Sequence, residues 1–353
     1  MIFTPFASTD IVSGRVQAIS EGVWSSGNPV AYTFYVLPSQ LNYTGSSAFD
    51  VLNGAYYTNV YDIDPTLSGS SAQTQFSVTY GNVNGSGSIT DLNAGSTLVT
   101  QTIYSQYRNI LLDPGDSVFT FQQSGSAAPT GYNSSDIYVI NFSQNSFKEQ
   151  LNPGTIQFNL QGTNGTFSFI DDSFLNTNNV GTSGQVYTIV NGTLTGGLTT
   201  TFDSVGRGYG LFYPDLGIIV LNPAAITDLV GVSLSPNLNT DKYYQNQNLL
   251  VSALQSGGYF QATSTEFSPT SHYFVRVQNQ SYNYTNNPTF VINSTGSNNG
   301  TILYPQFYND PNVYITTVGL YDSNNELLAV AKLSQPLQKT FETEALIRIL
   351  LSF

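Results

Sequence analysis

Two pairs of acidic residues are spaced closely enough in this sequence to act on a metal ion or a proton. Asp62 and Asp64 could donate carboxylate oxygens to a divalent cation, but such a site needs further oxygen ligands. Pro65 follows the pair directly, which is typical of a turn. Asp171 and Asp172 are adjacent at the end of a predicted strand, where neighbouring side chains point to opposite faces. Both pairs are therefore interpreted as structural.

The single histidine and one glycine-rich stretch are the other candidates for chemistry. A Ser/His/Asp triad would have to use His272, but the chain has no Gly-x-Ser-x-Gly motif. His272 directly precedes an apolar run, so we expect it at a strand end or at the edge of a core. Residues 206–210 (GRGYG) could cradle a phosphate only if a helix began directly after them. A predicted strand follows instead, so this stretch is interpreted as a loop or bulge.

Three arginines lie within or beside apolar runs, and each is expected to face solvent from a strand: Arg108, Arg276 and Arg348. Because the chain has only nine Lys and Arg residues, we also hypothesise that some of these arginines pair with acidic residues across subunit contacts. A glycosidase would need two carboxylates facing each other across a cleft, and no such pair stands out. The sequence therefore predicts no catalytic, cofactor-binding or metal-binding residue, and a protein that is not an enzyme.

Charged residues are sparse in this chain. They make up 9% of the 353 residues and leave a net charge of −13, whereas charged residues average about 25% of an ordinary soluble domain. Asn, Ser, Thr, Gly and Tyr take their place, a composition that suits surfaces covered by other proteins. Binding to nucleic acid or to anionic lipid needs clustered Lys and Arg, which this chain lacks. The composition favours a structural protein of an assembly, with no nucleic-acid or membrane partner.

Targeting and redox signals are also missing from the sequence. The first ten residues lack the basic and apolar segments of a signal peptide, and no apolar stretch approaches the length needed to span a bilayer. The chain contains no cysteine, which rules out disulfides and thiolate metal sites. We therefore expect a protein that is made and used without membrane insertion.

Short runs of alternating apolar and polar residues predict a mainly β fold of the β-rich α+β type. The 22 Phe and 24 Tyr residues fit pleated surfaces, and antiparallel sheets in sandwich-like domains are expected. The predicted strands cover residues 31–37, 75–80, 137–142, 155–160, 167–170, 185–190, 209–221, 272–277, 313–320, 327–333 and 345–353. Residues 103–112 are read as a further apolar strand around Arg108.

Turn and helix signals divide these strands. The stretch Pro214-Asp215-Leu216-Gly217 predicts a turn that folds residues 211–213 back on residues 218–221, and residues 322–325 predict a second hairpin. One or two helices are expected in the C-terminal half: a longer one near residues 241–256, with Thr240 as N-cap and Gly257 after its last turn, and a shorter one from Pro223.

A shift in composition near residues 134–136 marks the expected domain boundary. The part before it is rich in loops and short strands, and the part after it has longer strands and the predicted helix. We therefore expect a β-rich domain over residues 1–135 and a second β-rich domain over residues 136–353.

Four local strings carry a resemblance to known proteins. They are IYSQYRNILLDPGDSVFTF (103–121), DIYVINFSQNSFKEQLNPGTIQFNL (136–160), SHYFVRVQNQSYNYTNNPTFV (271–291) and DPNVYITTVGLYDSNNELLAVAKLSQPLQK (310–339). These strings resemble virion structural proteins of contractile-tailed bacteriophages, including marine cyanobacterial ones. The last string also resembles a hairpin of phage tail-fibre and baseplate-associated proteins. The resemblance implies a structural role and carries over no catalytic residue.

The expected function is therefore that of a structural component of a phage virion, in its tail, baseplate or neck, that acts by multi-copy assembly. Its partners would be its own copies and other virion proteins, and its location the virion after synthesis in the host cytoplasm. Residues 345–353 are expected to form a strand that clasps another subunit or domain. The alternative is a receptor- or carbohydrate-binding adhesin of the tail-fibre apparatus, in which Trp24, in a predicted Gly/Ser-rich loop, and the Tyr and Asn residues would contact a host-surface glycan.

Overall fold

The chain is mainly β, and its strands pair antiparallel, which confirms the predicted fold class. The computed structural model describes residues 5–37, 57–68, 72–88, 90–91, 95–96, 99–121, 131–175, 180–233, 245–285, 287–292 and 296–352. Two compact units are present: unit 1 combines residues 1–17 with residues 267–353, and unit 2 holds residues 18–266. Both unit boundaries fall inside strands, namely β1 (Ile11–Gly22) and β20 (Thr263–Val277).

The domain boundary predicted at residue 135 is not where the chain divides. Strands β4 (Thr74–Asn82) and β9 (Asp136–Phe142) pair across it, from Phe76 opposite Phe142 to Asn82 opposite Asp136. Because strands on either side of residue 135 belong to one sheet, the shift in composition does not separate two cores. The division into units depends on pairing between strands that are distant in sequence, and local composition does not predict such pairing.

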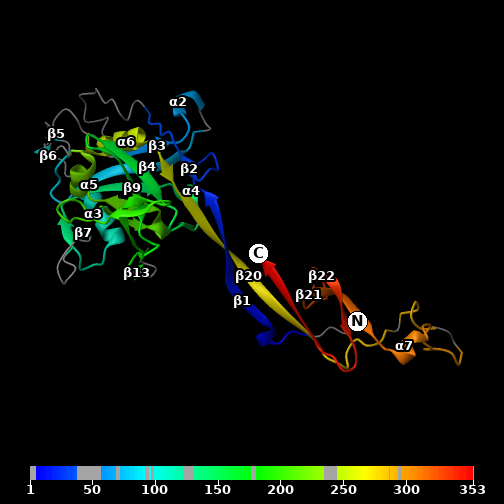
Figure 1. Cartoon of the computed structure of the whole chain (residues 1–353). Coiled ribbons are helices and arrows are strands. Elements are labelled where there is room, and N and C mark those ends of the chain that lie inside the picture. The colour runs from blue at the N-terminus through cyan, green and yellow to red at the C-terminus, as the bar shows by residue number, and fades with distance from the viewer. Residues whose placement is uncertain are drawn as a thin grey trace. The chain divides into compact units, whose positions relative to one another are not determined.

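Unit 2 is built on one 11-stranded sheet in the order β2-β19-β11-β12-β15-β17-β18-β9-β4-β3, with β16 added beside β15. Figure 1 labels β2, β3, β4 and β9 of this sheet. Its further strands are β2 (Val30–Ala31), β3 (Tyr57–Tyr61), β11 (Gln157–Gly162), β12 (Gly165–Asp171), β15 (Tyr187–Thr193), β16 (Gly197–Thr200), β17 (Gly210–Tyr213), β18 (Ile218–Leu221) and β19 (Phe260–Gln261). The predicted hairpin between β17 and β18 is confirmed, and Gly217 in its turn has a φ of 65°, which glycine adopts without strain.

Both faces of this sheet are covered, as the continuous apolar run of β9 requires. Ile137 and Val139 point into a core with helix α3 (Val99–Leu111), whereas Tyr138 and Ile140 point into a larger core with helices α5 (Pro223–Val230) and α6 (Gln245–Gly257). Alternate residues of one strand thus enter different cores. A strand that is buried on both faces reads as an unbroken apolar run instead of an alternating one.

The prediction of a strand around Arg108 is wrong, because residues 99–111 form helix α3. Its buried residues are Thr100, Ile103, Tyr104 and Leu111, which recur at helical spacing. A short apolar run such as IYSQYRNILL is ambiguous between strand and helix until its neighbours are known.

The two helices predicted in the C-terminal half are present. Helix α5 begins at Pro223, and the side chain of Asn222 caps it by accepting a hydrogen bond from the amide of Ala224. Helix α6 covers the longer prediction, although Thr240 and residues 241–244 lie outside the described residues. Gly258, and not Gly257, takes the left-handed conformation at its C-terminus and donates its N–H to the carbonyl of Leu254.

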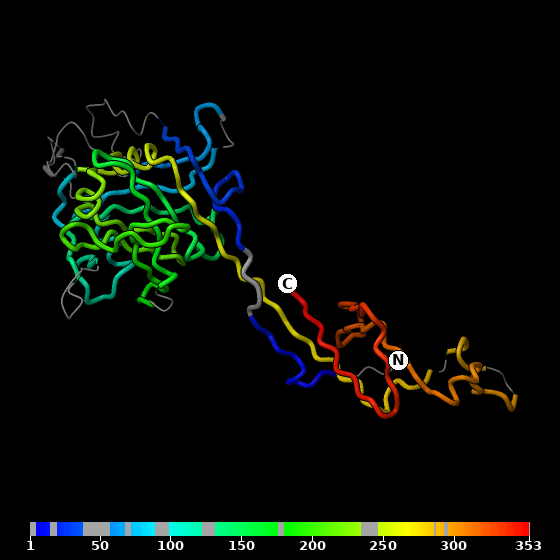
Figure 2. Tube along the Cα trace, viewed as in Figure 1, coloured from blue at the N-terminus to red at the C-terminus, as the bar shows by residue number. Residues whose placement is uncertain are grey.

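Unit 1 combines strand pairing at β20 with a long hairpin. The strand predicted near the end of the sequence forms as β23 (Ala345–Ser352) and pairs with β20 of the same unit, from Thr270 opposite Ser352 to Val277 opposite Ala345 (Figure 2). The edge of β23 that faces β20 is thus paired within unit 1, so the expectation that it clasps another domain is wrong for this edge. Phe353 lies outside the described residues. The predicted hairpin around residues 322–325 is confirmed as β21 (Val313–Tyr321) and β22 (Leu327–Lys339).

The remaining elements are short. They are η1 (Ser8–Asp10), α2 (Pro65–Ser68), β5 (Thr90–Asp91), β6 (Gly95–Ser96), β7 (Phe119–Phe121), β8 (Tyr132–Ser134), α4 (Gln144–Phe147), β10 (Gln150–Leu151), β13 (Val180–Gly181), β14 (Gly184–Gln185), η4 (Pro214–Leu216) and α7 (Gln306–Asn309). Among the described residues, no helix combines the length and apolar character needed to cross a membrane.

Candidate functional site

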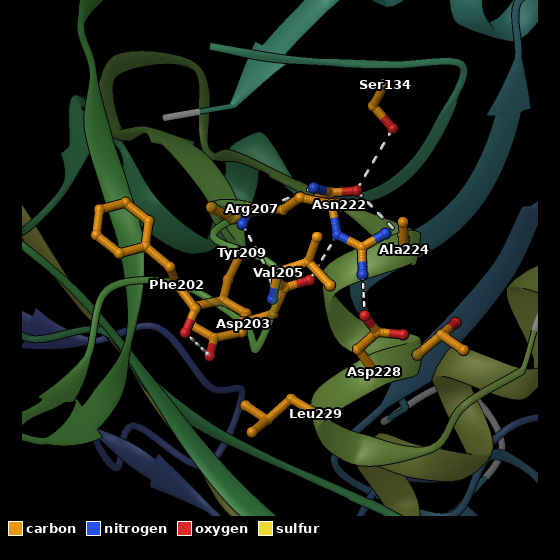
Figure 3. Close-up of polar contacts among 12 residues, drawn as sticks. Ser134, Phe202, Asp203, Val205, Arg207, Tyr209, Asn222, Ala224, Asp228 and Leu229 are labelled. Carbon is orange, nitrogen blue, oxygen red and sulfur yellow. Dashed lines mark hydrogen bonds and ion pairs between the residues drawn. The ribbon is translucent and has the colours of Figure 1, made fainter. Parts of the chain in front are cut away.

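Arg207, in the glycine-rich stretch 206–210, lies at the centre of a cluster of ion pairs and hydrogen bonds (Figure 3). The Nε of Arg207 donates to Asp203 Oδ2 at 2.6 Å, and its Nη2 donates to the carboxylate of Asp228. The other oxygen of Asp203 accepts the amides of Val205 at 3.0 Å and Arg207 at 2.7 Å. The Asp203 side chain is fully buried, and that of Arg207 is 15% exposed. Burial alone would lower the pKa of the guanidinium, but hydrogen bonding and attraction to Asp203 outweigh it and raise the pKa.

Asn222 connects this cluster to its surroundings. Its Nδ2 donates to the carbonyl of Gly208 at 3.0 Å, and its Oδ1 accepts from the amide of Ala224 and the hydroxyl of Ser134 (Figure 3). Strand β17 begins at Gly210, at the end of the glycine-rich stretch, so the prediction of a loop is confirmed and no helix begins directly after it. The cluster therefore fastens a loop between β16 and β17 to helix α5.

The Asp62/Asp64 pair holds two different turns. The carboxylate of Asp62 accepts from the hydroxyl of Ser25 and from the amide of Ser26 at 3.3 Å. Asp64 Oδ1 accepts from the hydroxyl and the amide of Thr66, at 2.7 and 2.8 Å, and these bonds lower the pKa of Asp64. No group of three or more His, Cys, Asp or Glu side chains that could hold a metal ion occurs in the part of the chain that the structure describes.

Asp171 and Asp172 also serve separate backbone groups. The Oδ2 of Asp171 accepts from the amide of Gly154 at 2.7 Å, and the Oδ1 of Asp172 accepts from the amide of Thr188 at 2.7 Å. Asp171 is completely buried, and this burial raises the pKa of its carboxyl although hydrogen bonds from Ser173 and Gly154 oppose the rise. Each carboxylate fixes a neighbouring segment, in agreement with the structural interpretation.

Replacing Asp171 by asparagine should change how stability depends on pH. Because the folded state raises the pKa of Asp171 above its ordinary value of 3.8, its stabilising contribution is present below that value and is lost as pH rises through the folded-state pKa. Asparagine does not titrate and can still accept the Gly154 amide. The free energy of unfolding of the variant minus that of the wild type, from urea titrations, should become more positive as the pH rises above about 4. A difference that stays constant or falls would contradict the proposed burial effect.

His272 lies in the interior of β20 and not at a strand end, because β20 begins at Thr263. It stands opposite Leu350 of β23. A triad histidine bonds to a carboxylate through one ring nitrogen, whereas no described residue forms a hydrogen bond with Nδ1 of His272. The histidine is therefore part of the pleated surface of this sheet.

Trp24 is a core residue, so its expected role in stacking on a sugar is wrong. Its side chain is 2% exposed, and Nε1 donates to the carbonyl of Pro29 at 3.1 Å. The aromatic rings around it have centroids 5.4–6.2 Å away: Phe34, Phe76, Phe142 and Phe260. The Gly/Ser-rich composition next to Trp24 suggested an exposed loop, but long-range packing of phenylalanines from other strands encloses the indole.

The arginines do not share one role. Arg276 donates from Nε to Asp10 Oδ1 at 3.0 Å, so this arginine has an acidic partner within its own chain, whereas the hypothesis placed such partners on another subunit. Arg108 bonds to the neighbouring side chain of Asn109. Arg348 is exposed on β23, and the described residues form no ion pair with it.

Most of the exposed large apolar side chains lie on unit 1. The sequence alone did not predict where these side chains gather. Unit 1 holds 104 of the 353 residues but 17 of the 26 exposed large apolar side chains that the structure describes. On its strands these include Tyr314, Tyr321, Leu327, Leu328, Val330, Leu337, Leu346 and Leu350. The apolar cluster inside unit 1 is built around only Leu320, Ile347 and Ile349. Contiguous apolar patches on a soluble protein mark interaction sites.

The two units also differ in charge. Unit 1 contains six acidic and five basic residues, which gives a net charge of −1, whereas unit 2 contains sixteen acidic and four basic residues, which gives −12. Nearly all of the negative charge of the chain thus lies on unit 2. A surface close to neutrality favours association, and a strongly charged surface opposes it.

Comparison with known proteins found no matching family model, no matching curated protein and no matching solved structure. Function is therefore inferred from the residues of the chain itself.

Proposed function

We propose that this chain is a structural subunit of a phage virion, in the tail, baseplate or neck, that acts by multi-copy assembly. The observation that carries the proposal is the apolar, nearly neutral surface of unit 1, which burial against neighbouring subunits would remove from water. The resemblance of residues 103–121, 136–160, 271–291 and 310–339 to virion proteins supplies the link to a phage.

The polar clusters agree with an architectural role. The carboxylates of Asp203 and Asp171 hold loop and backbone groups of unit 2 in place. Unit 2 would then serve as a rigid body, and unit 1 would supply the contacts to other copies and to other virion proteins. Assembly requires no cofactor in this scheme.

Antibody labelling tests the proposal directly. Particles purified from lysates of cells that carry this gene should contain the chain, and gold-labelled antibody raised against the purified protein should mark the tail body in electron micrographs. Unlabelled virions, together with recovery of the protein only in the soluble fraction, would contradict a virion role.

The second candidate function, an adhesin for a host-surface glycan, is favoured by one specific feature of unit 1. Tyr284, Tyr304 and Tyr308 are about half exposed, and the rings of Tyr284 and Tyr304 pack against Phe290 with centroids 6.1 and 6.0 Å apart. Exposed aromatic rings offer flat apolar faces with a polar tip, which suit both sugars and proteins. In the labelling experiment an adhesin would mark the fibre tips, whereas an architectural subunit would mark the tail body.

A further inference from the structure

We propose that strand β23 of unit 1 is the surface through which a second copy of this chain associates, by pairing along its open edge and covering its outer face. The inference rests on the proposed multi-copy function and names the strand that makes the contact.

The side-chain pattern of β23 is apolar on both faces. Ala345, Ile347 and Ile349 are 6–8% exposed and point toward the cluster shared with the β21–β22 hairpin. On the opposite face Leu346 is 61% exposed and Leu350 is 50% exposed. A strand with one face in water normally alternates apolar and polar residues, whereas a strand that is apolar on both faces is typical of burial on both sides.

The outer face of the neighbouring strand extends this apolar surface. In the β20–β23 register Leu346 stands opposite Arg276, Arg348 opposite Phe274, and Leu350 opposite His272. Leu346, Leu350 and Phe274 therefore share one face of the sheet. Since Arg276 is already paired with Asp10, Arg348 is the cation on this face that lacks an acidic partner among the described residues.

The edge of β23 is open as well. Among the described strands β23 pairs only with β20, so the backbone groups along its other edge have no strand partner. Proteins that keep an edge strand free usually protect it with lysine, proline or a bulge. Arg348 is the sole charge in β23, whose register with β20 is unbroken over eight residues. An apolar, regular edge of this kind is a template for another strand.

The charge of unit 1 favours a second copy as the occupant. Two units that carry a net charge of −1 each can approach without strong repulsion, whereas contact through unit 2 would bring charges of −12 together. A basic partner would be drawn to unit 2 instead. An apolar strand is also complementary to itself in an antiparallel pair, as a two-fold contact requires.

Arg348 limits the register of such a pair. If two β23 strands were centred on Arg348, the two guanidinium groups would stand directly opposite each other, which destabilises a strand pair. A pair centred on Ile347 or Ile349 instead places each Arg348 opposite Leu346 or Leu350 of the other copy. This register lets the aliphatic stem of arginine cover a leucine.

The oligomeric state of the full chain tests the proposal. We expect the wild-type protein to sediment as an oligomer and the double variant Leu346→Thr/Leu350→Thr to dissociate with a dissociation constant about tenfold higher or more. Threonine keeps the strand preference and the net charge of the chain while it removes apolar area from the outer face. The matched control Leu67→Thr/Leu175→Thr changes the same residue type at sites of unit 2 that are 85% and 59% exposed, and it should associate like the wild type.

A cross-linking measurement covers the case in which the double variant misfolds, which circular dichroism would reveal. The chain has no cysteine, so a Leu350→Cys variant carries a single reactive thiol. With a short bis-maleimide it should yield covalent dimers, and a Leu67→Cys variant should yield none. A monomeric wild type, a double variant that associates as strongly as the wild type, or equal cross-linking at both positions would overturn the proposal. Labelling of virions by the antibody would be unaffected by such a result, so the two proposals can fail separately.

Discussion

We expect the Trp24→Ala variant to unfold with a free energy about 3 to 5 kcal/mol below that of the wild-type protein. Trp24 is the only tryptophan of the chain, is 2% exposed and contacts four phenylalanine rings in the larger core of unit 2. Removal of the indole leaves a cavity among side chains from several strands, whereas the carbonyl of Pro29 keeps its hydrogen bond from the amide of Ala262. Urea titration followed by far-ultraviolet circular dichroism measures the effect in both proteins, because it does not depend on tryptophan fluorescence.

An exposed leucine supplies the control for this measurement. Leu67 is 85% exposed, so Leu67→Ala should change the free energy of unfolding by no more than about 0.5 kcal/mol. If Trp24→Ala costs no more than this control, the indole does not fill a core. If Trp24→Ala instead shows the expected large loss, a loss of glycan binding in this variant would reflect unfolding and not a lost stacking partner.

The Arg207→Met variant should lose about 3 to 5 kcal/mol of unfolding free energy, measured by the same urea titration. The substitution leaves Asp203, whose side chain is fully buried, without the cation 2.6 Å away that offsets its charge. Adding Asp203→Asn should recover part of the loss, because the amide oxygen can still accept the Val205 and Arg207 amides while the buried charge is gone.

An exposed ion pair is the matched control for Arg207. Lys148 lies 2.5 Å from Glu266 and 3.5 Å from Glu21, but the three side chains are 41–60% exposed, so Lys148→Met should lower the free energy of unfolding far less than Arg207→Met. Equal losses for Arg207→Met and Lys148→Met would show that the Arg207 cluster contributes no more than a surface pair.

Secondary structure with a strong local signal could be predicted from the sequence. The Pro-Asp-Leu-Gly turn, the hairpin at residues 322–325 and the helix from Pro223 form where their turn and capping residues predict, because such residues act through their immediate neighbours. Residues 99–111 were beyond this kind of inference, since their apolar run satisfies both a strand and a helix and only packing against β4 decides between them.

Some features of the candidate polar sites could likewise be predicted from neighbouring residues, and others could not. The turn role of Asp64 followed from Pro65 beside it, and the loop at Arg207 followed from its glycines. Asp62 instead bonds to Ser25 and Ser26, a contact that its neighbours did not predict. The contacts of Asp171 with Gly154 and of Arg207 with Asp228 depended on folding, because Gly154 lies in a turn before β11 and Asp228 lies on helix α5.

The mainly β character, the low charge and the positions of the turns were therefore contained in the order of neighbouring residues. The tertiary structure alone decided that Trp24 is enclosed, that Arg276 meets Asp10 across 266 positions of the chain, and that unit 1 combines both ends of this sequence. These features depend on which distant strands pair, and that choice comes from the burial of apolar surface over the whole chain, which no local pattern records.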